Sequence, residues 1–512
     1  MARVKELNVV RKKGKPGSVK IGLVYPSVYE VAIASLAYQM IYYYVNSLDD
    51  FIGERFNLAT LTGEEPKPLS LESDTPLEKF EIALFSVHYE PDYVNIVRLL
   101  MAAGIDPRKE IKERPLIIIG GLPLLGNPEP LANIADVLVI GEIEPTIPYM
   151  LHKYLEHRDD KRAFLDSLNP ERGFYVPKNE PDEVLVVRAD ELSPQFHPIA
   201  QLQPIKEGSV WERGTMIEAM RGCPHRCAFC LEASVMGPKR DRPLAQIVKI
   251  ASEGAKLNMS NKAILYALSF FDHSKADDIL KRLHDIGLKT SVPSLRLETL
   301  DEDRLEMISL GGQKTLTLAP ETASKEISIS IGKPLIKERL LEVALAAKKA
   351  GIKSLKLYFM VGLPGETMED VKTIPKLIRR LSEFSGFKGE RELKVNITPF
   401  IPKPRTPLER ARMEDVNTLR KKIELIRREL RGLAEARSYD PRWALVQALL
   451  SRGDRGISTL LVRWAMHGGG LGGLRRALRE LGIRADPNES IKEEVPWAKI
   501  RDVQMTCLKN SH

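Results

Sequence analysis

Three cysteines within eight residues are the part of this sequence whose types and spacing are best suited to chemistry. Cys223, Cys227 and Cys230 stand in the run Arg221-Gly222-Cys223-Pro224-His225-Arg226-Cys227-Ala228-Phe229-Cys230. A loop with these spacings can wrap three corners of a small metal cluster. The chain has one further cysteine, Cys507, far along the sequence.

Two kinds of metal site are compatible with this loop. A structural zinc site uses four closed ligands, and His225 is the nearest candidate for a fourth, although its position beside Cys223 strains a tetrahedron. Iron–sulfur clusters are commonly held by four cysteines, so three cysteines leave one iron open. An open metal position is typical of catalytic sites.

The elements around the cysteine loop repeat as strand and helix. Met216 to Met220 directly precedes the loop, and amphipathic segments such as Leu335 to Gly351 separate most of the strand candidates. Six such units predict an α/β fold with a partial (β/α)6 barrel of the TIM type, whose chemistry lies at the carboxyl ends of the strands. The strand candidates are 215–220, 263–269, 288–293, 314–319, 354–361 and 393–400.

A second α/β region precedes the barrel. Apolar strands alternate there with helical patterns, of which Val31 to Val45 and Tyr93 to Ala103 are examples. This alternation predicts an open parallel sheet, which binds ligands beyond the carboxyl ends of its strands. The strand candidates are 19–25, 82–87, 115–119 and 136–140, and the residues at their ends are Ser86, His88, Gly120, Gly121, Asn127, Glu129, Gly141 and Glu142.

The remaining segments complete the expected domain bounds. Residues 151–212 are charged and proline-rich, which is typical of a connector. The region after about residue 410 is helical, because its apolar residues form one stripe: Val416, Leu419, Ile423, Ile426, Leu430 and Leu433. We expect an α/β domain with an open sheet at 1–150, a connector at 151–212, the barrel at 213–409 and a basic helical region at 410–512.

Positive charge is concentrated in the helical region. The whole chain has 77 Lys and Arg and 69 Asp and Glu, a net charge of +8. The stretch from Arg412 to Gly482 alone has 15 basic and 8 acidic residues. Such a surface suits RNA, and it also occurs as an ordinary solvated helix face.

The composition excludes several classes of protein. A chain of 512 residues with 43% hydrophobic and 29% charged residues is globular and has about three domains. Four cysteines are too few for a disulfide scaffold. Polar residues and tyrosines interrupt the uncharged segment Val31 to Leu48, so we expect a buried amphipathic helix and no membrane span. The N-terminus lacks the apolar core of a signal peptide, so a cytoplasmic location is expected.

The cysteine run resembles the signature of the radical S-adenosylmethionine (radical SAM) enzymes, Cys-x3-Cys-x-aromatic-Cys, with Phe229 as the aromatic residue. The resemblance implies that Cys223, Cys227 and Cys230 hold a 4Fe–4S cluster whose open iron is chelated by SAM. It also implies an electron donor such as a reduced ferredoxin or flavodoxin. The 5′-deoxyadenosyl radical released from SAM then attacks a C–H bond of a substrate that the sequence does not identify.

Other positions match this superfamily one by one. Gly362, Leu363 and Pro364 correspond to the segment after the fifth barrel strand that packs against adenine. Arg296 and Glu321 follow strands three and four, where polar groups contact the ribose and methionyl parts of SAM. The Gly-Gly-Glu segment usual after strand two is replaced by Ala267-Leu268-Ser269-Phe270-Phe271, which leaves Ser269 as the candidate for the SAM amine.

The N-terminal region resembles the cobalamin-binding-type domain of one branch of the superfamily. Gly120-Gly121, Asn127-Pro128-Glu129-Pro130 and Gly141-Glu142 carry this resemblance, and Arg452-Gly453-Asp454-Arg455 matches a subgroup with an uncharacterised substrate. The Asp-x-His-x-x-Gly segment that supplies the lower cobalt ligand in many cobalamin proteins is absent, and the sequence around His88 does not match it. Cobalamin therefore either binds without that ligand or does not bind.

Four functions follow as hypotheses. The first is a radical SAM enzyme acting on a C–H bond, with RNA as a candidate substrate. The second is cobalamin-dependent methylation. Sulfur insertion of the methylthiotransferase kind is disfavoured, because those enzymes carry a second three-cysteine cluster and only Cys507 remains here. The fourth is a metal-bearing RNA-binding module without catalysis.

Overall fold

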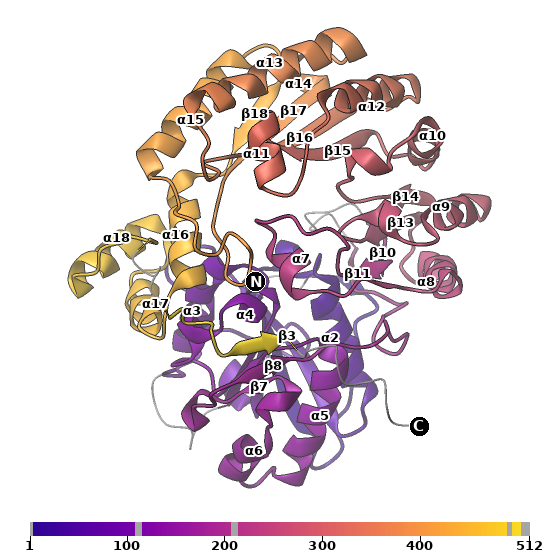
Figure 1. The fold of residues 1–512 in the computed structure, drawn as a ribbon. Coiled ribbons are helices and arrows are strands. Elements are labelled where there is room, and N and C mark those ends of the chain that lie inside the picture. The colour runs from indigo at the N-terminus through magenta and orange to yellow at the C-terminus, as the bar shows by residue number, and fades with distance from the viewer. Residues whose placement is uncertain (1–3, 108–114, 206–212, 489–493, 503–512) are drawn as a thin grey trace, which may run out of the picture. The chain divides into compact units, whose positions relative to one another are not determined.

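The computed structural model describes residues 4–107, 115–205, 213–488 and 494–502 (Figure 1). The chain forms two compact units. The first unit comprises residues 1–198, 202–212 and 449–512, and the second comprises residues 199–201 and 213–448.

The first unit contains a six-stranded sheet in the order β3-β2-β4-β5-β6-β7. All neighbouring strands are parallel except β7, which is antiparallel to β6. The predicted parallel sheet is therefore confirmed, with β3 and β7 as strands that the sequence did not indicate. The strands of this unit are β1 (Glu6–Leu7), β2 (Val19–Val28), β3 (Phe51–Leu58), β4 (Ile82–Ser86), β5 (Leu116–Gly120), β6 (Val137–Val139), β7 (Phe174–Tyr175), β8 (Val184–Val186), β9 (Gln203–Pro204) and β19 (Ile500–Asp502).

The helix predicted at Val31 to Val45 is divided in two. The first piece ends at Ala32, and Ser35 caps the second, since its side chain accepts a hydrogen bond from the Tyr38 backbone N–H at 3.3 Å. Within the described residues, no helix is both long and apolar enough to cross a membrane. The helices of this unit are α1 (Tyr29–Ala32), α2 (Leu36–Ser47), α3 (Tyr93–Ala102), α4 (Leu122–Gly126), α5 (Ile143–Glu156), α6 (Lys161–Ser167), α17 (Ile457–Met466) and α18 (Gly470–Leu481).

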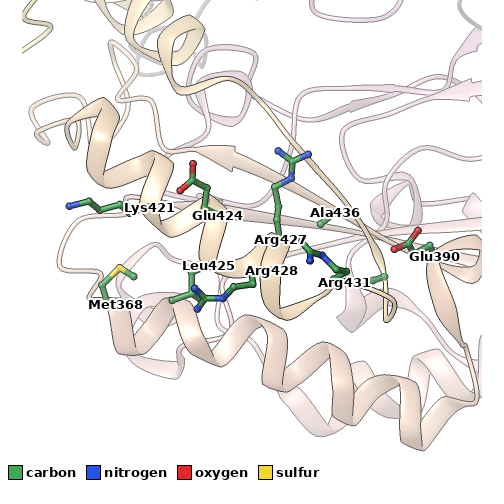
Figure 2. A pocket seen from close by; sticks show the side chains of 10 residues that line it. Met368, Glu390, Lys421, Glu424, Leu425, Arg427, Arg428, Arg431 and Ala436 are labelled. Carbon is green, nitrogen blue, oxygen red and sulfur yellow. The ribbon is translucent and has the colours of Figure 1, made fainter.

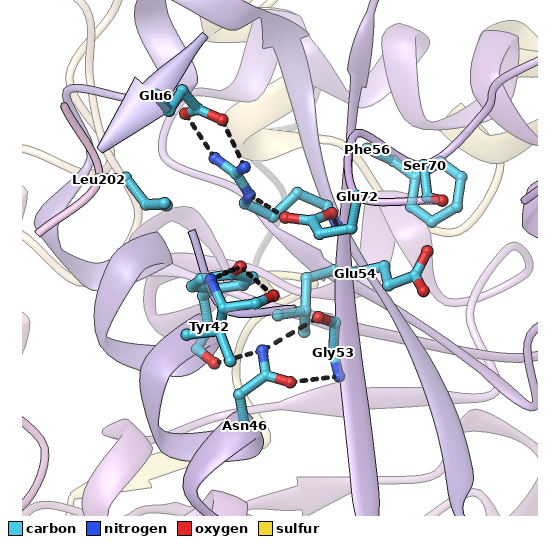
Figure 3. Close-up of polar contacts among 12 residues, drawn as sticks. Glu6, Tyr42, Asn46, Gly53, Glu54, Phe56, Ser70, Glu72 and Leu202 are labelled. Carbon is cyan, nitrogen blue, oxygen red and sulfur yellow. Dashed lines mark hydrogen bonds and ion pairs between the residues drawn. The ribbon is translucent and has the colours of Figure 1, made fainter. Parts of the chain in front are cut away.

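Strand β3 carries a buried charge, which explains why its sequence does not look like a strand. Arg55 is 1% exposed and makes ion pairs of 2.6 Å with both Glu6 and Glu72. Figure 3 shows these contacts, and also Asn46 of α2 exchanging two hydrogen bonds of 3.0 Å with the backbone of Gly53. Paired in this way, a guanidinium is tolerated in the interior.

The compact units do not follow the four segments expected from the sequence. Residues 151–198 belong to the first unit, because Phe164 of α6 and Phe174 of β7 are fully buried in its core. The helical region divides at Leu449, within α16 (Pro441–Arg452). Its later part joins the first unit, where β19 pairs with β8.

The second unit is a partial barrel of parallel strands. Its sheets have the orders β10-β13-β14 and β15-β16-β17-β18, and a parallel bridge between Leu295 and Leu318 connects them. The six predicted strands are confirmed as β10 and β13 to β17, and β18 is a seventh. The strands are β10 (Thr215–Glu218), β11 (Met220–Arg221), β12 (Arg240–Asp241), β13 (Lys262–Tyr266), β14 (Lys289–Ser291), β15 (Thr315–Glu321), β16 (Ser354–Val361), β17 (Leu393–Pro399) and β18 (Glu435–Ser438).

Amphipathic helices cover the outer side of these strands (Figure 1). The predicted apolar stripe of α15 is buried at Leu419, Ile423 and Ile426, and Lys422 is buried with it, whereas the other basic residues of this helix are exposed. The helices are α7 (Leu231–Val235), α8 (Leu244–Leu257), α9 (Ala276–Asp285), α10 (Glu302–Leu310), α11 (Lys325–Ser330), α12 (Lys337–Lys349), α13 (Met368–Ser385), α14 (Gly389–Glu392) and α15 (Val416–Glu429).

Candidate metal centre

The cysteine loop begins where β10 and β11 end, at the carboxyl edge of the barrel strands. Gly222 starts the loop with φ of 78°, a left-handed conformation that favours glycine. A Cβ atom there would lie 2.7 Å from the Pro238 carbonyl oxygen and 2.8 Å from that of Met236. The sharp entry into the loop therefore requires glycine.

Backbone hydrogen bonds hold the loop to two other segments of the barrel. The Ala228 N–H donates to the Ile331 carbonyl at 2.9 Å, and the Leu408 N–H donates to the Ala228 carbonyl at 3.2 Å. At the end of the loop, Cys230 caps α7, because its Sγ accepts from the Ala233 N–H at 3.4 Å. These bonds fix the position of the loop without using the thiols of Cys223 and Cys227.

The three thiols lie near one another in a partly desolvated site. Cys227 is buried, and Cys223 and Cys230 are half-buried. Burial raises the pKa of Cys230 to about 11 and also raises the pKa of Cys223, and the neighbouring thiols contribute in the same direction. Thiolates in this position need a bound cation, and metal binding must therefore release protons.

His225 does not point at the thiols as a fourth ligand. Its Nε2 lies 2.7 Å from Asp272 Oδ2, so its side chain is directed to the segment after β13. Ser269, the candidate for the SAM amine, is 2% exposed and donates its hydroxyl hydrogen bond to the same carboxylate oxygen. Asp272 thus joins the cysteine loop to the segment that replaces Gly-Gly-Glu, a role that the sequence did not indicate.

Arg296, in the loop after β14, lies against the cysteine loop. Its Nη1 is 3.6 Å from Cys227 Sγ, and its Nη2 is 3.4 Å from Glu298 Oε1. Its Nε is buried and makes no hydrogen bond among the described residues, although it lies 3.4 Å from Glu298 Oε2 in an ion pair. A guanidinium beside a cysteine sulfur stabilises the thiolate that a metal requires.

Glu321, at the end of β15, has a strained backbone, with φ of 66°. Its carboxylate accepts a hydrogen bond of 2.7 Å from Lys333 Nζ, and both side chains are largely buried. Burial raises the pKa of Glu321, while Lys333 and Arg296 lower it. Lys333 is therefore a second residue of this site that the sequence did not indicate.

The turn after β16 is held by a buried network. Gly362 has φ of 81°, and its N–H donates to Glu366 Oε2 at 2.7 Å. Lys422 of α15 lies 3.0 Å from the same oxygen and 2.8 Å from Glu414 Oε2. Leu363 is buried in an apolar cluster against which Phe229 of the cysteine loop packs. Pro364 is half-buried in the same turn.

The residues fit a multi-iron cluster with an open position. Three thiols come from one loop, and N–H donors approach two of the sulfurs. Among the residues that the structure describes, no group of three or more His, Cys, Asp or Glu side chains is arranged to hold a metal ion, so the fit rests on the chemistry of the three thiols and of the donors around them. Buried polar atoms also remain for a ligand to pair, since Glu366 Oε1, like Arg296 Nε, has no hydrogen-bond partner among these residues. Cys507 lies outside the described residues.

The first unit has a separate candidate site where its strand order reverses. The order β3-β2-β4-β5-β6 is that of doubly wound folds, which bind ligands beyond the ends of the two strands at the switch point. After β4, exposed His88 stacks on Tyr25 of β2 at 5.7 Å between ring centroids and lies 3.2 Å from Ser35 Oγ. Nearby, burial raises the pKa of Asp92 to about 7. Perturbed carboxyl groups of this kind are common at binding sites.

Glycine allows the neighbouring loop to approach this site closely. Gly121, after β5, has φ of 143°, and a Cβ there would lie 1.7 Å from the Val87 carbonyl oxygen. The Gly120-Gly121 pair therefore lets the loop after β5 lie directly against the residue that precedes His88.

Two motifs that lie far apart in the sequence bind each other in the first unit. Asn127 Nδ2 donates to the carbonyls of Ser451 at 3.0 Å and Gly453 at 2.8 Å. Arg455 donates to Glu129 Oε2 at 2.8 Å and to the Tyr175 hydroxyl at 2.6 Å. The Asn-Pro-Glu-Pro and Arg-Gly-Asp-Arg motifs are therefore two halves of one structural contact.

Comparison with known families gives two matches on this chain. The model of radical SAM proteins, N-terminal, matches residues 37–177, and that of the radical SAM superfamily matches residues 217–378. The uncharacterised protein MJ0966 of Methanocaldococcus jannaschii is 29% identical over 444 residues, which cover 86% of this chain and 90% of the relative. The putative methylthiotransferase MJ0865 of the same organism is 24% identical over 306 residues, covering 57% and 62%.

Solved structures share the fold at low sequence identity. TsrM from Kitasatospora setae, a radical SAM methyltransferase solved with cobalamin and a [4Fe-4S] cluster, is 16% identical with a TM-score of 0.52, covering 91% of this chain and all of that chain. OxsB, a cobalamin-dependent radical SAM enzyme, is 14% identical with a TM-score of 0.51, covering 70% and 52%. The likeness extends over both α/β parts of the present fold.

Proposed function

The chain belongs to the radical SAM superfamily, and from this premise we propose that Cys223, Cys227 and Cys230 are the ligands of its 4Fe–4S cluster and that the segments after β14, β15 and β16 bind SAM. When bound, the cluster supplies the electron that cleaves SAM to methionine and a 5′-deoxyadenosyl radical. With the cluster and SAM bound, this chemistry would attack a C–H bond of a substrate that is not identified.

One observation carries this proposal. The three thiols, Arg296 and the Glu321–Lys333 pair all lie at the carboxyl ends of parallel strands, and Arg296 donates to Cys227 Sγ. In barrels of this kind, that edge is where chemistry is done.

The side chains divide the recognition of SAM among them. The guanidinium of Arg296, whose contacts with half-exposed Glu298 are as long as 3.4 Å, is suited to the methionyl carboxylate, because guanidinium donors pair well with carboxylates. Glu321, held by Lys333, offers a buried acceptor for the ribose hydroxyls. Leu363, Pro364 and Phe229 offer apolar surface for adenine beside the Gly362 turn.

Ser269 is proposed to act through Asp272. Since the Ser269 hydroxyl already donates to Asp272, its remaining role is to orient that carboxylate. Asp272 is an acid after strand two, and it is therefore our candidate to accept from the SAM amine. The neighbouring His225 holds it from the side of the cysteine loop.

Reconstitution under anaerobic conditions tests the cluster. Cys223→Ala, Cys227→Ala and Cys230→Ala should each abolish iron–sulfur absorption and the formation of 5′-deoxyadenosine with a reduced ferredoxin or flavodoxin as electron donor. Cys507→Ala is the matched control and should change neither. One zinc per chain with no SAM cleavage would instead identify a non-catalytic metal-bearing module.

A second candidate function is cobalamin-dependent methylation, favoured by the switch point of the first unit. His88, Tyr25 and Asp92 lie there, and the TsrM and OxsB folds to which this chain is similar belong to cobalamin enzymes. When bound, cobalamin supplies a methyl carrier. The chain's own residues would hold the corrin at the ends of β2 and β4, without the usual Asp-x-His-x-x-Gly segment.

Retention of cobalamin tests this second candidate separately. The wild-type chain, refolded or reconstituted with hydroxocobalamin and passed through gel filtration, should keep the corrin absorption. Gly121→Val should lose it, because its side chain would collide with the Val87 carbonyl beside the site. A chain that cleaves SAM but retains no corrin would leave radical SAM hydrogen abstraction as the function.

A further inference from the structure

A groove runs along α15 on the second unit, and the cluster chemistry does not use it. It has a volume of about 800 Å³. Figure 2 shows the residues that line it: Met368, Glu390, Lys421, Glu424, Leu425, Arg427, Arg428, Arg431, Ala434 and Ala436. They come from α13, α14, α15, the segment after α15 and β18.

The groove concentrates positive charge that the protein leaves largely unpaired. Lys421, Arg427, Arg428 and Arg431 are all exposed. Within the described ranges, Lys421, Arg427 and Arg431 make no ion pair, and Arg428 lies 3.5 Å from Glu429. Because α15 buries Leu419, Ile423 and Ile426 on its inner face, its basic residues other than the buried Lys422 are exposed.

This charge pattern suits a chain of phosphates. Lys421 lies about two turns before Arg427 and Arg428 on α15, and Arg431 follows just past the end of the helix, so the four cations are spread along the groove and can meet more than one phosphate. Arginine recognises phosphate with paired donors. Each phosphate neutralised releases counterions, which provides most of the binding free energy.

The lining also distinguishes between anionic partners. Protein interfaces are anchored by aromatic residues, and bases of single strands stack on them, but none of the ten lining residues is aromatic. Glu390 and Glu424 are hydrogen-bond acceptors among the cations. A 2′-hydroxyl donates to such acceptors, and this group is present in RNA and absent from DNA.

We infer that the α15 groove binds the sugar-phosphate backbone of a folded RNA, which is the substrate or carries it. This inference rests on the proposed function only in calling the RNA a substrate. Binding itself is measured without SAM or catalysis.

Fluorescence anisotropy with the full chain tests the groove. The probes are a labelled 20-base-pair RNA hairpin and a DNA hairpin of the same sequence, each over a series of salt concentrations. The triple variant Lys421→Gln/Arg427→Gln/Arg431→Gln should bind the RNA hairpin at least tenfold more weakly, and its slope of log K against log salt should be shallower by about 2.7. The control Lys249→Gln/Lys256→Gln/Lys281→Gln removes the same charge from α8 and α9 and should bind like the wild type.

Each result supports or overturns the inference. Salt-sensitive RNA binding that is lost only in the groove variant supports it. Equal binding of RNA and DNA, or competition by poly-glutamate as strong as by RNA, overturns it in favour of another anionic partner. Unchanged RNA binding by the groove variant overturns it outright. Formation of 5′-deoxyadenosine in the groove variant, assayed without RNA, shows whether the proposed SAM chemistry stands independently.

Discussion

Removing the charge of Lys422 should weaken SAM binding and destabilise the second unit. Lys422 is 2% exposed, and its ammonium is the cation between the carboxylates of Glu366 and Glu414. Glu366 in turn accepts the Gly362 N–H in the turn that we assign to adenine. Lys422→Met keeps the length of the side chain and leaves the Glu366 carboxylate buried without its counterion.

The expected magnitude follows from burial. Removing one member of a buried ion pair costs about 3–5 kcal/mol, and we expect the upper part of this range because the Glu366 side chain is only 1% exposed. Part of this loss is avoided if Glu366 becomes protonated, since burial already raises its pKa. Displacement of the turn should weaken SAM binding about tenfold, or ~1.4 kcal/mol.

A double-mutant cycle separates the two effects. Glu366→Gln retains an acceptor for the Gly362 N–H, so the double variant Lys422→Met/Glu366→Gln should recover much of the lost stability. Thermal unfolding measures stability, and calorimetric titration of the reconstituted protein measures the Kd for SAM. Lys421→Met, on the exposed side of the same helix, is the control. If Lys422→Met lowers stability but leaves the Kd for SAM unchanged, the network supports only the fold and our assignment of the turn is wrong.

Three further predictions concern other sites. Asn127→Ala should lower the free energy of unfolding by about 2–4 kcal/mol, because it leaves the buried carbonyls of Ser451 and Gly453 without donors. The control Asn133→Ala removes one exposed contact and should change little in the same thermal unfolding assay. Burial raises the pKa of Asp92 from near 4 in the unfolded chain to about 7 in the folded protein, so stability should fall as pH rises from about 4 to about 7. Asp92→Asn should abolish that fall, and the control Asp50→Asn should leave it unchanged. Gly222→Ala should prevent cluster assembly, measured by iron content, because its methyl group meets two carbonyls, whereas Gly472→Ala meets open space.

The sequence predicted both sheets because their strands are apolar and their order follows the chain. The strands it missed are those whose residues are charged or few. β3 contains Glu54 and Arg55, and the latter is buried only because Glu6 and Glu72, from other segments, pair with it. β18, Glu435 to Ser438, has one apolar residue and is a strand because β17 offers it a parallel partner. Such pairing is a tertiary effect that local composition does not contain.

The residues of the candidate site likewise fall into two groups, those that the local sequence indicates and those that depend on the fold. The cysteine spacing and the glycines at 222 and 362 could be interpreted locally, because each reflects a requirement of its own loop. Asp272, Lys333 and Lys422 could not, because each acts on a segment contributed by another part of the fold. In the sequence, each of the three is only an ionisable residue. What marks it is that the fold buries it.

Residues at several strand ends contact the cysteine loop and fix its position. This explains why three cysteines are enough to form the metal centre. The thiols need deprotonation in a site where burial raises the pKa of Cys230 to about 11. Arg296 supplies a cationic donor to Cys227, the N-terminus of α7 supplies an N–H to Cys230, and the backbone bonds of Ala228 position the loop independently of both. Among the described residues, His225, the candidate for a fourth ligand, points to Asp272 instead, so under the proposed function an open iron would be left for SAM, and the strand ends that hold the loop would also hold SAM.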